Sequence, residues 1–372
     1  MKFAIYPIGL LLLTASCNET TNSETIKTEN KKPKNIILLI GDGMGLSQVS
    51  STYFFNDQAS NFDRFNSIGL IKTSASSDLI TDSAAGATAF ATGIKTYNGA
   101  ISVDPDSLAV ETIVERISED KIATGVIATS SIVHATPASF YAHEKSRRSY
   151  DAIAADLVES DIDFFAGGGQ QFFDQREDSI DLYNTLQEKG YTITTEGLPT
   201  GVSSLDMLKK QAILLAADEM PKMLDGRGDY LPNATRLGID YLSKNKEGFF
   251  LMVEGSQIDW GGHANDSGYL ISELIDFDKT IGVALDFAKL NGETLVIVTA
   301  DHETGGFTLA TEDGNYNKIE PTFSTGGHSA TLVPVFAYGP GEEDFAGIYE
   351  NTGIYYKMMN LLGYKNSKDN NQ

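Results

Sequence analysis

The chain has 372 residues, 41% of which are hydrophobic, and its formal net charge is −23 at pH 7. This length and this apolar content are sufficient for one large α/β domain or for two small ones. The strong negative charge argues against nucleic acid or an anionic membrane surface as a binding partner.

The N-terminal segment MKFAIYPIGLLLLTAS, residues 1–16, has the features of a signal peptide. Lys2 precedes an apolar stretch from Phe3 to Leu13 that is too short to span a bilayer as a mature helix. The small residues TAS come directly before Cys17, the only cysteine, as in a bacterial lipoprotein cleavage site. We therefore predict an exported protein, either periplasmic or anchored in the outer membrane through a lipid on Cys17. An ordinary secretory signal followed by an incidental cysteine is the alternative.

The mature chain is predicted to hold one folded domain and no internal disulfide. Residues 17–34 combine the cysteine with a polar segment that lacks apolar periodicity, which indicates a disordered tether. From residue 35 to residue 364, short apolar runs alternate with amphipathic stretches, and no linker of different composition interrupts them. Residues 365–372 form a polar tail.

Six continuous apolar runs predict strands that are buried on both faces. They lie at residues 35–40, 125–130, 163–168, 249–255, 294–300 and 333–339. Amphipathic segments predict helices at residues 111–120, 150–160, 179–190, 233–245 and 269–290. This alternation predicts a three-layer α/β/α sandwich with a mostly parallel central sheet, whose sites lie at the carboxyl ends of the strands.

The stretch TDSAAGATAFATG predicts a further helix, rich in alanine, that ends at Gly93. It begins with Thr81, Asp82 and Ser83. One of these side chains can cap the helix by accepting a hydrogen bond from a free backbone N–H. Alternatively, one hydroxyl is a nucleophile, placed where the N–H groups of the helix terminus attract a phosphate. The local sequence leaves both interpretations open.

Carboxylates and histidines follow several predicted strands within glycine-rich loops. They are Asp42, Glu254, Asp259, His263, Asp301, His302 and His328. Taken singly, an aspartate before glycine is most often a turn residue, and a histidine is most often a hydrogen-bonded structural group. Together they indicate zinc-type ligands, in numbers sufficient for two ions. A dinucleotide-binding loop at GDGMGL is a poor alternative, because the third glycine of G-x-G-x-x-G is missing.

The segment VHATPASFYAHEKSRRSY carries another cluster of polar groups, with His134 and Thr136 followed by Arg147 and Arg148. An arginine side chain can make bidentate contacts to phosphate oxygens. Arg147 is a candidate for this role, whereas we interpret Arg148 as a solvated surface charge.

These motifs together resemble those of the alkaline phosphatase family. GDGMG, TDSAAGATAFATGIKTYNGA, HATPASFYAHEKSRR, VEGSQIDWGGH, TADHETGG and GGHSA occur in the family's order, and the likeness is strongest to compact, cold-adapted marine bacterial members. The resemblance implies a homodimeric hydrolase that acts on phosphate monoesters at alkaline pH through a phosphoserine and releases inorganic phosphate for scavenging. The alternative is a phosphodiesterase of the same superfamily. A sulfatase is disfavoured because DSAAG lacks the Cys/Ser-x-Pro-x-Arg motif, and a metal- or phosphate-capture lipoprotein would have no use for a nucleophile.

The resemblance also implies two Zn²⁺ ions and one Mg²⁺ ion per chain, with Ser83 as the nucleophile and Arg147 as the phosphate-binding residue. The implied ligands are Asp42, Asp301 and His302 for one zinc ion, Asp259, His263 and His328 for the other, and Asp42, Thr136 and Glu254 for magnesium. His134 and Trp260 stand where the enteric member has an aspartate and a lysine. We count both among the substrate-binding residues and expect them to weaken the hold on magnesium and phosphate.

Overall fold

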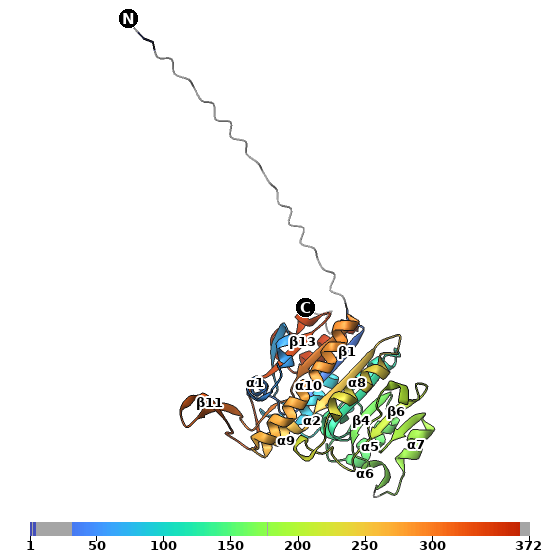
Figure 1. The fold of residues 1–372 in the computed structure, drawn as a ribbon. Coiled ribbons are helices and arrows are strands. Elements are labelled where there is room, and N and C mark those ends of the chain that lie inside the picture. The colour runs from blue at the N-terminus through green and yellow to red at the C-terminus, as the bar shows by residue number, and fades with distance from the viewer. Residues whose placement is uncertain (2, 5–31, 177, 365–372) are drawn as a thin grey trace. The chain divides into compact units, whose positions relative to one another are not determined.

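The computed structural model describes residues 1, 3, 4, 32–176 and 178–364 (Figure 1). Almost all of the predicted signal peptide, Cys17, most of the tether and the polar tail lie outside these residues. The fold is that of the compact unit formed by residues 31–372, over the part of it that the structure describes. Within the described part of the chain, no helix is both long and apolar enough to cross a bilayer.

A ten-stranded sheet forms the centre of this unit. Its strands are β1 (Asn35–Gly41), β2 (Ser67–Lys72), β3 (Ala123–Ser131), β4 (Phe164–Gly168), β5 (Tyr191–Thr194), β6 (Lys210–Leu214), β7 (Phe249–Gly255), β8 (Thr294–Thr299), β13 (Val333–Tyr338) and β14 (Gly347–Glu350). The spatial order is β14-β2-β13-β8-β1-β7-β3-β4-β6-β5. Only β13 runs antiparallel to its neighbours β2 and β8, so the predicted mostly parallel sheet is confirmed.

Helices flank the sheet and complete the predicted sandwich (Figure 1). They are α1 (Leu46–Phe55), α2 (Ser83–Thr92), α3 (Ile113–Ser118), α4 (Ala135–Ala138), α5 (Tyr150–Glu159), α6 (Gln171–Asp174), α7 (Leu182–Glu188), α8 (Tyr230–Leu242), α9 (Gln257–His263), α10 (Ser267–Asn291) and α11 (Thr352–Leu362). The long helix α10 packs against α1, α8 and α9, whereas α2 packs against α3, α4 and α11. Short 3-10 helices lie at Asn61–Arg64, Val202–Ser204, Met223–Asp225 and Glu342–Phe345.

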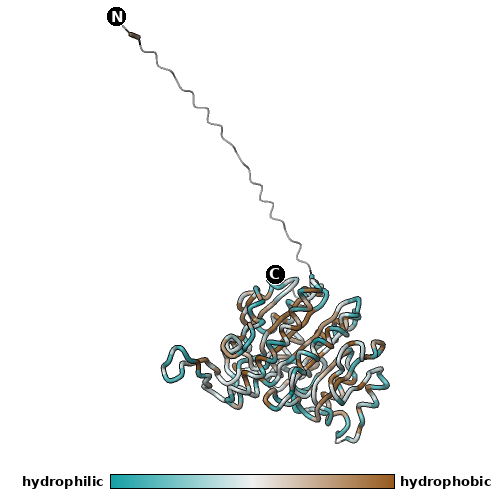
Figure 2. The backbone as a smooth tube through the Cα atoms, viewed as in Figure 1, coloured by the Kyte–Doolittle hydropathy of each residue, from teal (hydrophilic) through white to brown (hydrophobic). Residues whose placement is uncertain are grey.

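Two small antiparallel ribbons lie outside the central sheet. They are β9 (Glu303–Thr304) with β12 (His328–Ser329), and β10 (Thr308–Glu312) with β11 (Asn315–Thr322). The β10–β11 hairpin projects from the body of the unit (Figure 1), and its tip is hydrophilic while the central strands are hydrophobic (Figure 2).

All six predicted strands are present, because each is an apolar run that is buried along most of its length. The sequence did not predict β2, whose side chains alternate between buried and more exposed positions, or the short strands β5, β6 and β14. Helix α1 was also missed, since its N-cap Gly45 offers no side-chain cap and its ends carry no favourable charge. Helix α8 begins at Tyr230, three residues before the predicted start at Asn233.

The order of the strands decides where the functional groups meet. Strands β8, β1, β7 and β3 are consecutive in the sheet and mutually parallel, so their carboxyl ends lie side by side. The segments that carry Asp301, Asp42, Glu254 and Thr136 are at or just beyond these four ends. A local pattern of polar residues after separate strands thus becomes one cluster.

Candidate active site

The start of helix α2 separates the capping residue from the candidate nucleophile. Asp82 is the N-cap, and its Oδ1 accepts a hydrogen bond from the Ala85 amide at 3.0 Å. Ser83 is the first residue of the helix and is buried, with its Oγ 3.4 Å from Asp42 Oδ1 and 3.2 Å from His302 Nε2. Because Asp82 satisfies the cap, the Ser83 hydroxyl faces the polar cluster instead of the helix backbone.

The first predicted ligand group is fully buried and closely spaced. His302 Nε2 lies 3.4 Å from Asp42 Oδ1 and 3.3 Å from Asp301 Oδ2. Burial and the neighbouring carboxylates, Asp301 first among them, raise the pKa of Asp42 well above its usual range. Burial, together with the nearby His328, lowers the pKa of His302 to about 3, so this imidazole is neutral. A neutral imidazole with two buried carboxylates has the donor atoms that zinc binds.

The second predicted group forms beside the first. Asp259 and His263 lie one turn apart on α9, with His263 Nε2 at 3.4 Å from Asp259 Oδ2. Pairing of β12 with β9 brings His328 to the same place, 3.1 Å from His263 and 3.6 Å from Asp259 between the nearest atoms. The His302 and His328 rings stack at 3.6 Å between centroids, so the two groups are contiguous.

The third predicted group consists of oxygen atoms from Asp42, Thr136 and Glu254. Asp42 Oδ2, Thr136 Oγ1 and Glu254 Oε1 are all buried and find no hydrogen-bond partner among the described residues. The other oxygen of Glu254 accepts hydrogen bonds from the hydroxyls of Ser256 at 2.6 Å and Ser130 at 3.3 Å. Buried polar atoms are rarely left unpaired, so these three oxygens fit a hard cation such as magnesium.

Arg147 faces this cluster from the loop that follows α4. Its Nη1 donates to Asp82 Oδ2 at 3.0 Å, and its Nη2 lies 3.4 Å from His134 Nε2. Burial and the Arg147 charge lower the pKa of His134 to about 3, so the imidazole is neutral beside the guanidinium. Trp260 packs edge-on against His134 at 5.8 Å between ring centroids. The structure thus brings Arg147, His134 and Trp260 together.

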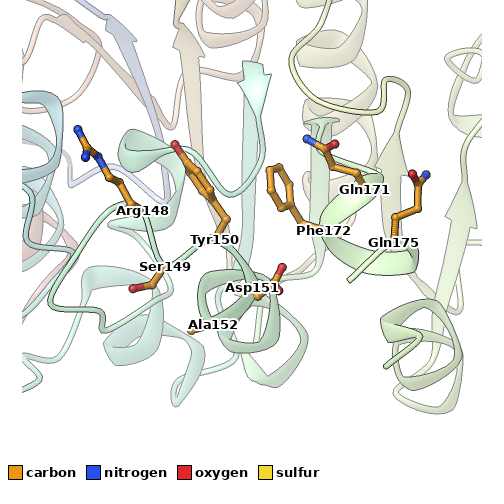
Figure 3. A pocket seen from close by; sticks show the side chains of 8 residues that line it. All are labelled: Arg148, Ser149, Tyr150, Asp151, Ala152, Gln171, Phe172 and Gln175. Carbon is orange, nitrogen blue, oxygen red and sulfur yellow. The ribbon is translucent and has the colours of Figure 1, made fainter. Parts of the chain in front are cut away.

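Arg148 has different surroundings, although it follows Arg147 directly. It lines a cavity of about 480 Å³ with Ser149, Tyr150, Asp151, Ala152, Gln171, Phe172 and Gln175 (Figure 3). The Tyr150 and Phe172 rings lie 5.1 Å apart between centroids. Arg148 is exposed, and its guanidinium makes no hydrogen bond or ion pair with residues 32–176 or 178–364. It shares none of the partners of Arg147, as expected for a solvated charge.

Sequence reasoning missed two buried polar residues that lie beside the predicted ligands. The Thr304 hydroxyl donates to Asp259 Oδ1 at 2.5 Å and lies 3.1 Å from His302 Nδ1, so it touches both ligand groups. Glu303 is buried, and its carboxylate accepts hydrogen bonds from the Gln48 amide group at 2.9 Å and from the Ser329 hydroxyl. Both residues lie in DHETGG, directly after the predicted ligands, which is the signal that could have identified them.

One glycine is required by the close packing of this site. Gly43 has a φ of +73°, and a Cβ atom there would lie 2.8 Å from Thr304 Oγ1 and 2.9 Å from the Asp259 Cα. Only glycine combines that backbone conformation with such a close approach. Its amide donates to Asp301 Oδ1 at 3.2 Å, which joins the loop after β1 to the loop after β8.

Known proteins support the same interpretation. A family model described as alkaline phosphatase matches residues 33–322. Alkaline phosphatase 3 of Bacillus subtilis is 35% identical over 445 aligned positions, which cover 95% of this chain and 94% of that protein. The alkaline phosphatase of Escherichia coli is 31% identical and covers 90% of this chain and 87% of its own length.

Solved structures agree with these sequence relatives. The alkaline phosphatase of the Antarctic bacterium TAB5 has 57% sequence identity and a TM-score of 0.89, with 90% of this chain and 99% of that chain covered. A cold-active alkaline phosphatase from a psychrophilic Shewanella has 32% identity and a TM-score of 0.81. These relatives favour a phosphomonoesterase over the phosphodiesterase alternative. The resemblance seen in the motifs is therefore confirmed, and the chain belongs to the alkaline phosphatase family.

Proposed function

We propose that this phosphomonoesterase transfers the phosphoryl group of its substrate to Ser83. The observation that supports this proposal is the position of the buried Ser83 hydroxyl, which lies at the first turn of α2 within 3.4 Å of both Asp42 and His302. Attack of Oγ on phosphorus in line with the ester oxygen forms the Ser83 phosphoester and breaks the bond to the alcohol. Water then cleaves the phosphoserine, which restores the hydroxyl and releases inorganic phosphate.

Arg147 is proposed to bind the phosphoryl oxygens. A guanidinium has five N–H donors, and Asp82 accepts from one of them. Asp82 therefore fixes the orientation of the group and leaves other donors for the substrate. His134, which is neutral, adds no competing positive charge, and Trp260 covers its ring.

The three ligand groups are proposed to hold two Zn²⁺ ions and one Mg²⁺ ion, with the residues assigned as in the sequence analysis. The unpartnered buried oxygens of Asp42, Thr136, Glu254 and Asp301 support this assignment. Bound cations of this kind lower the pKa of a hydroxyl or water and neutralise charge on a transferring phosphoryl group. A histidine-to-aspartate variant of the TAB5 enzyme carries Mg in its M3 site, so the same fold accommodates that ion.

Metal removal tests this proposal. Chelation is expected to abolish p-nitrophenyl phosphate hydrolysis, and zinc with magnesium is expected to restore it. Metal analysis of the same samples should show loss and recovery of both ions. Full turnover by protein that is free of zinc would contradict the assignment.

We also propose a homodimer that buries helix α1. Four large apolar side chains on this helix are exposed, namely Leu46, Tyr53, Phe54 and Phe55, with exposed fractions of 37–60%. Such a cluster on one helix is typical of an interaction surface, and a symmetric homodimer is the commonest assembly. Sedimentation is expected to show a dimer that Phe54→Asp converts to a monomer. A monomeric parent would contradict the proposal.

Export and lipidation at Cys17 are proposed from the N-terminal sequence. The support is the apolar segment of residues 3–13 and the TAS sequence before the single cysteine. Cys17→Ala is expected to move the protein from the membrane fraction to the soluble periplasmic fraction. Unchanged membrane association would mean that no lipid on Cys17 anchors the protein.

A further inference from the structure

The loop between α4 and α5 carries Arg147 and is held by a second segment, residues 99–103. Ile101 and Glu144 exchange two backbone hydrogen bonds, at 2.8 and 3.0 Å. The Arg147 amide itself donates to the Gly99 carbonyl at 2.7 Å. The position of the guanidinium therefore depends on how these two segments pair.

His143, four residues before Arg147, connects this loop to three other parts of the fold. Its Nδ1 lies 2.9 Å from the Ser102 carbonyl oxygen, and its Nε2 lies 2.8 Å from Glu115 Oε1 on α3. Its amide donates to Asp156 Oδ2 on α5 at 3.0 Å. The imidazole is half-buried and does not contact any proposed metal ligand.

Both hydrogen-bond partners of the His143 ring are acceptors. The Ser102 carbonyl carries no proton, and the second oxygen of Glu115 already accepts from the Thr112 amide at 2.7 Å in the capping box of α3. Burial raises the pKa of Glu115, but the hydrogen bonds from His143 and Thr112 outweigh it and lower the pKa overall. A ring that faces two acceptors can satisfy both only when both of its nitrogens carry hydrogen.

The charges around the ring favour this cationic form. Glu115 faces it from α3 and Asp156 from α5, and both are acidic. The hydrogen bond to Glu115 raises the pKa of His143, against the opposing effect of burial. The geometry and the surrounding charge thus agree on an imidazolium.

We propose that His143 is a positioning residue for Arg147: its imidazolium donates to Ser102 and Glu115 at once and so holds the loop in the conformation that presents Arg147 to the phosphoryl group. This inference rests on the proposed role of Arg147 in phosphate binding. When the proton is lost, one ring nitrogen faces an acceptor without a hydrogen between them. One of the two connections then breaks, and Arg147 is held less firmly.

Inorganic phosphate is the probe for this proposal. Its inhibition constant would be measured with the metal-loaded enzyme against p-nitrophenyl phosphate, at pH values from about 6 to about 10, which begin below the ordinary histidine pKa of about 6.5 and extend well above it. His143→Ala is expected to raise the inhibition constant about three- to tenfold at the low end, because misplacing a binding group loses affinity. This factor should shrink as the pH rises through the pKa of His143, where the parent also loses its second donor.

Glu115→Gln provides the complementary variant. Glutamine keeps the acceptor of the capping box, and its amide can donate to the neutral Nε2 of His143. The connection between His143 and α3 then no longer needs the second ring proton. This variant should therefore bind phosphate more tightly than the parent at the high end of the pH range. Glu119→Gln is the matched control, because Glu119 is an exposed acid at the end of α3 that pairs with Arg116. The phosphate inhibition constant of this control variant is expected to equal that of the parent at every pH measured.

The outcomes separate positioning from a merely structural role. If His143→Ala weakens phosphate binding by one constant factor and Glu115→Gln follows the parent at every pH, the proposal is wrong. Nitrogen NMR of the parent offers a test without a variant of uncertain folding: both His143 ring nitrogens should be protonated near neutral pH, and a neutral ring there would overturn the inference. Unchanged phosphate inhibition in Arg147→Ala would instead overturn the proposed role of Arg147 and remove the basis of this inference.

Discussion

Asp82 Oδ2 accepts a hydrogen bond from Arg147 Nη1 at 3.0 Å, while Oδ1 of the same carboxylate caps helix α2 beside Ser83. One side chain therefore sets the position of both the proposed nucleophile and the proposed phosphate-binding group. Because Asp82 and Arg147 come from separate segments, this contact also joins the start of α2 to the loop before α5.

Arg147→Ala is predicted to weaken inhibition by inorganic phosphate about 10- to 100-fold, since a hydrogen bond to a charged group contributes about 1.5–3 kcal/mol. Arg148→Ala is the matched control, because the adjacent guanidinium is exposed and shares none of these partners. Competitive inhibition of p-nitrophenyl phosphate hydrolysis measures both. Equal losses in the two variants would assign the effect to general surface charge.

Thr304→Val is predicted to lower the affinity for metal. The hydroxyl contacts Asp259 Oδ1 and lies 3.1 Å from His302 Nδ1, so it orients one residue of each ligand group. Loss of such a supporting hydrogen bond typically costs about 10- to 100-fold in metal affinity. Valine keeps the shape of threonine, so the substitution removes only the hydroxyl. Competition for zinc with a chromophoric chelator measures the zinc affinity of the variant and of the parent. Parent-like zinc affinity would show that Thr304 does not orient the ligands.

Replacement of His134 by aspartate is predicted to increase the magnesium requirement. His134 Nδ1 is buried without a partner among the described residues, and the ring is neutral. An aspartate would add a hard anionic group two residues before Thr136, one of the proposed magnesium ligands. Titration with magnesium, followed by calorimetry, should show that the variant binds the ion more tightly than the parent. The same titration followed by activity should show a stronger dependence of turnover on magnesium. An unchanged requirement would argue that position 134 does not face the third ion.

Asp276 is predicted to contribute stability near pH 4 that is lost as the pH rises to about 6. Burial raises the pKa of this carboxyl to about 6, although Arg227 at 2.9 Å opposes the shift. The folded state then keeps a proton that the unfolded state has released, so the free energy of unfolding decreases across this window, by up to about 3 kcal/mol. Urea unfolding of Asp276→Asn should show a weaker pH dependence than the parent.

Asp286→Asn is the control for this measurement, because Asp286 lies on the same helix but its side chain is 66% exposed. Its pH dependence should match that of the parent. If Asp276→Asn also matches the parent, Asp276 does not carry the effect.

The sequence predicted the central strands and their polar ends because both are local features. The run NIILLI specifies a buried strand, and Asp42 follows it by two residues. Strand β2 is different: it has an alternating pattern, and its place in the sheet depends on pairing with β13 and β14, which are more than 250 residues away. The local sequence of β2 therefore does not predict its pairing with β13 and β14.

The assignment of ligand groups depended on the resemblance to a family, since spacing alone cannot say which residues converge. His328 and Asp259 meet only because β12 pairs with β9. The contacts of Thr304 and His143 are likewise set by tertiary structure. Thr304 contacts Asp259, which is 45 positions away in the sequence, and His143 contacts Glu115, which is 28 positions away. Neither contact can be predicted from the local sequence.

The central claim is that Ser83 carries the phosphoryl group, and acid trapping of the enzyme with radiolabelled phosphate tests it most directly. Peptide mass spectrometry of the trapped protein is expected to find phosphoserine at Ser83, and Ser83→Ala should lose both the label and nearly all turnover. Label on Thr81, or substantial turnover by Ser83→Ala, would contradict the account.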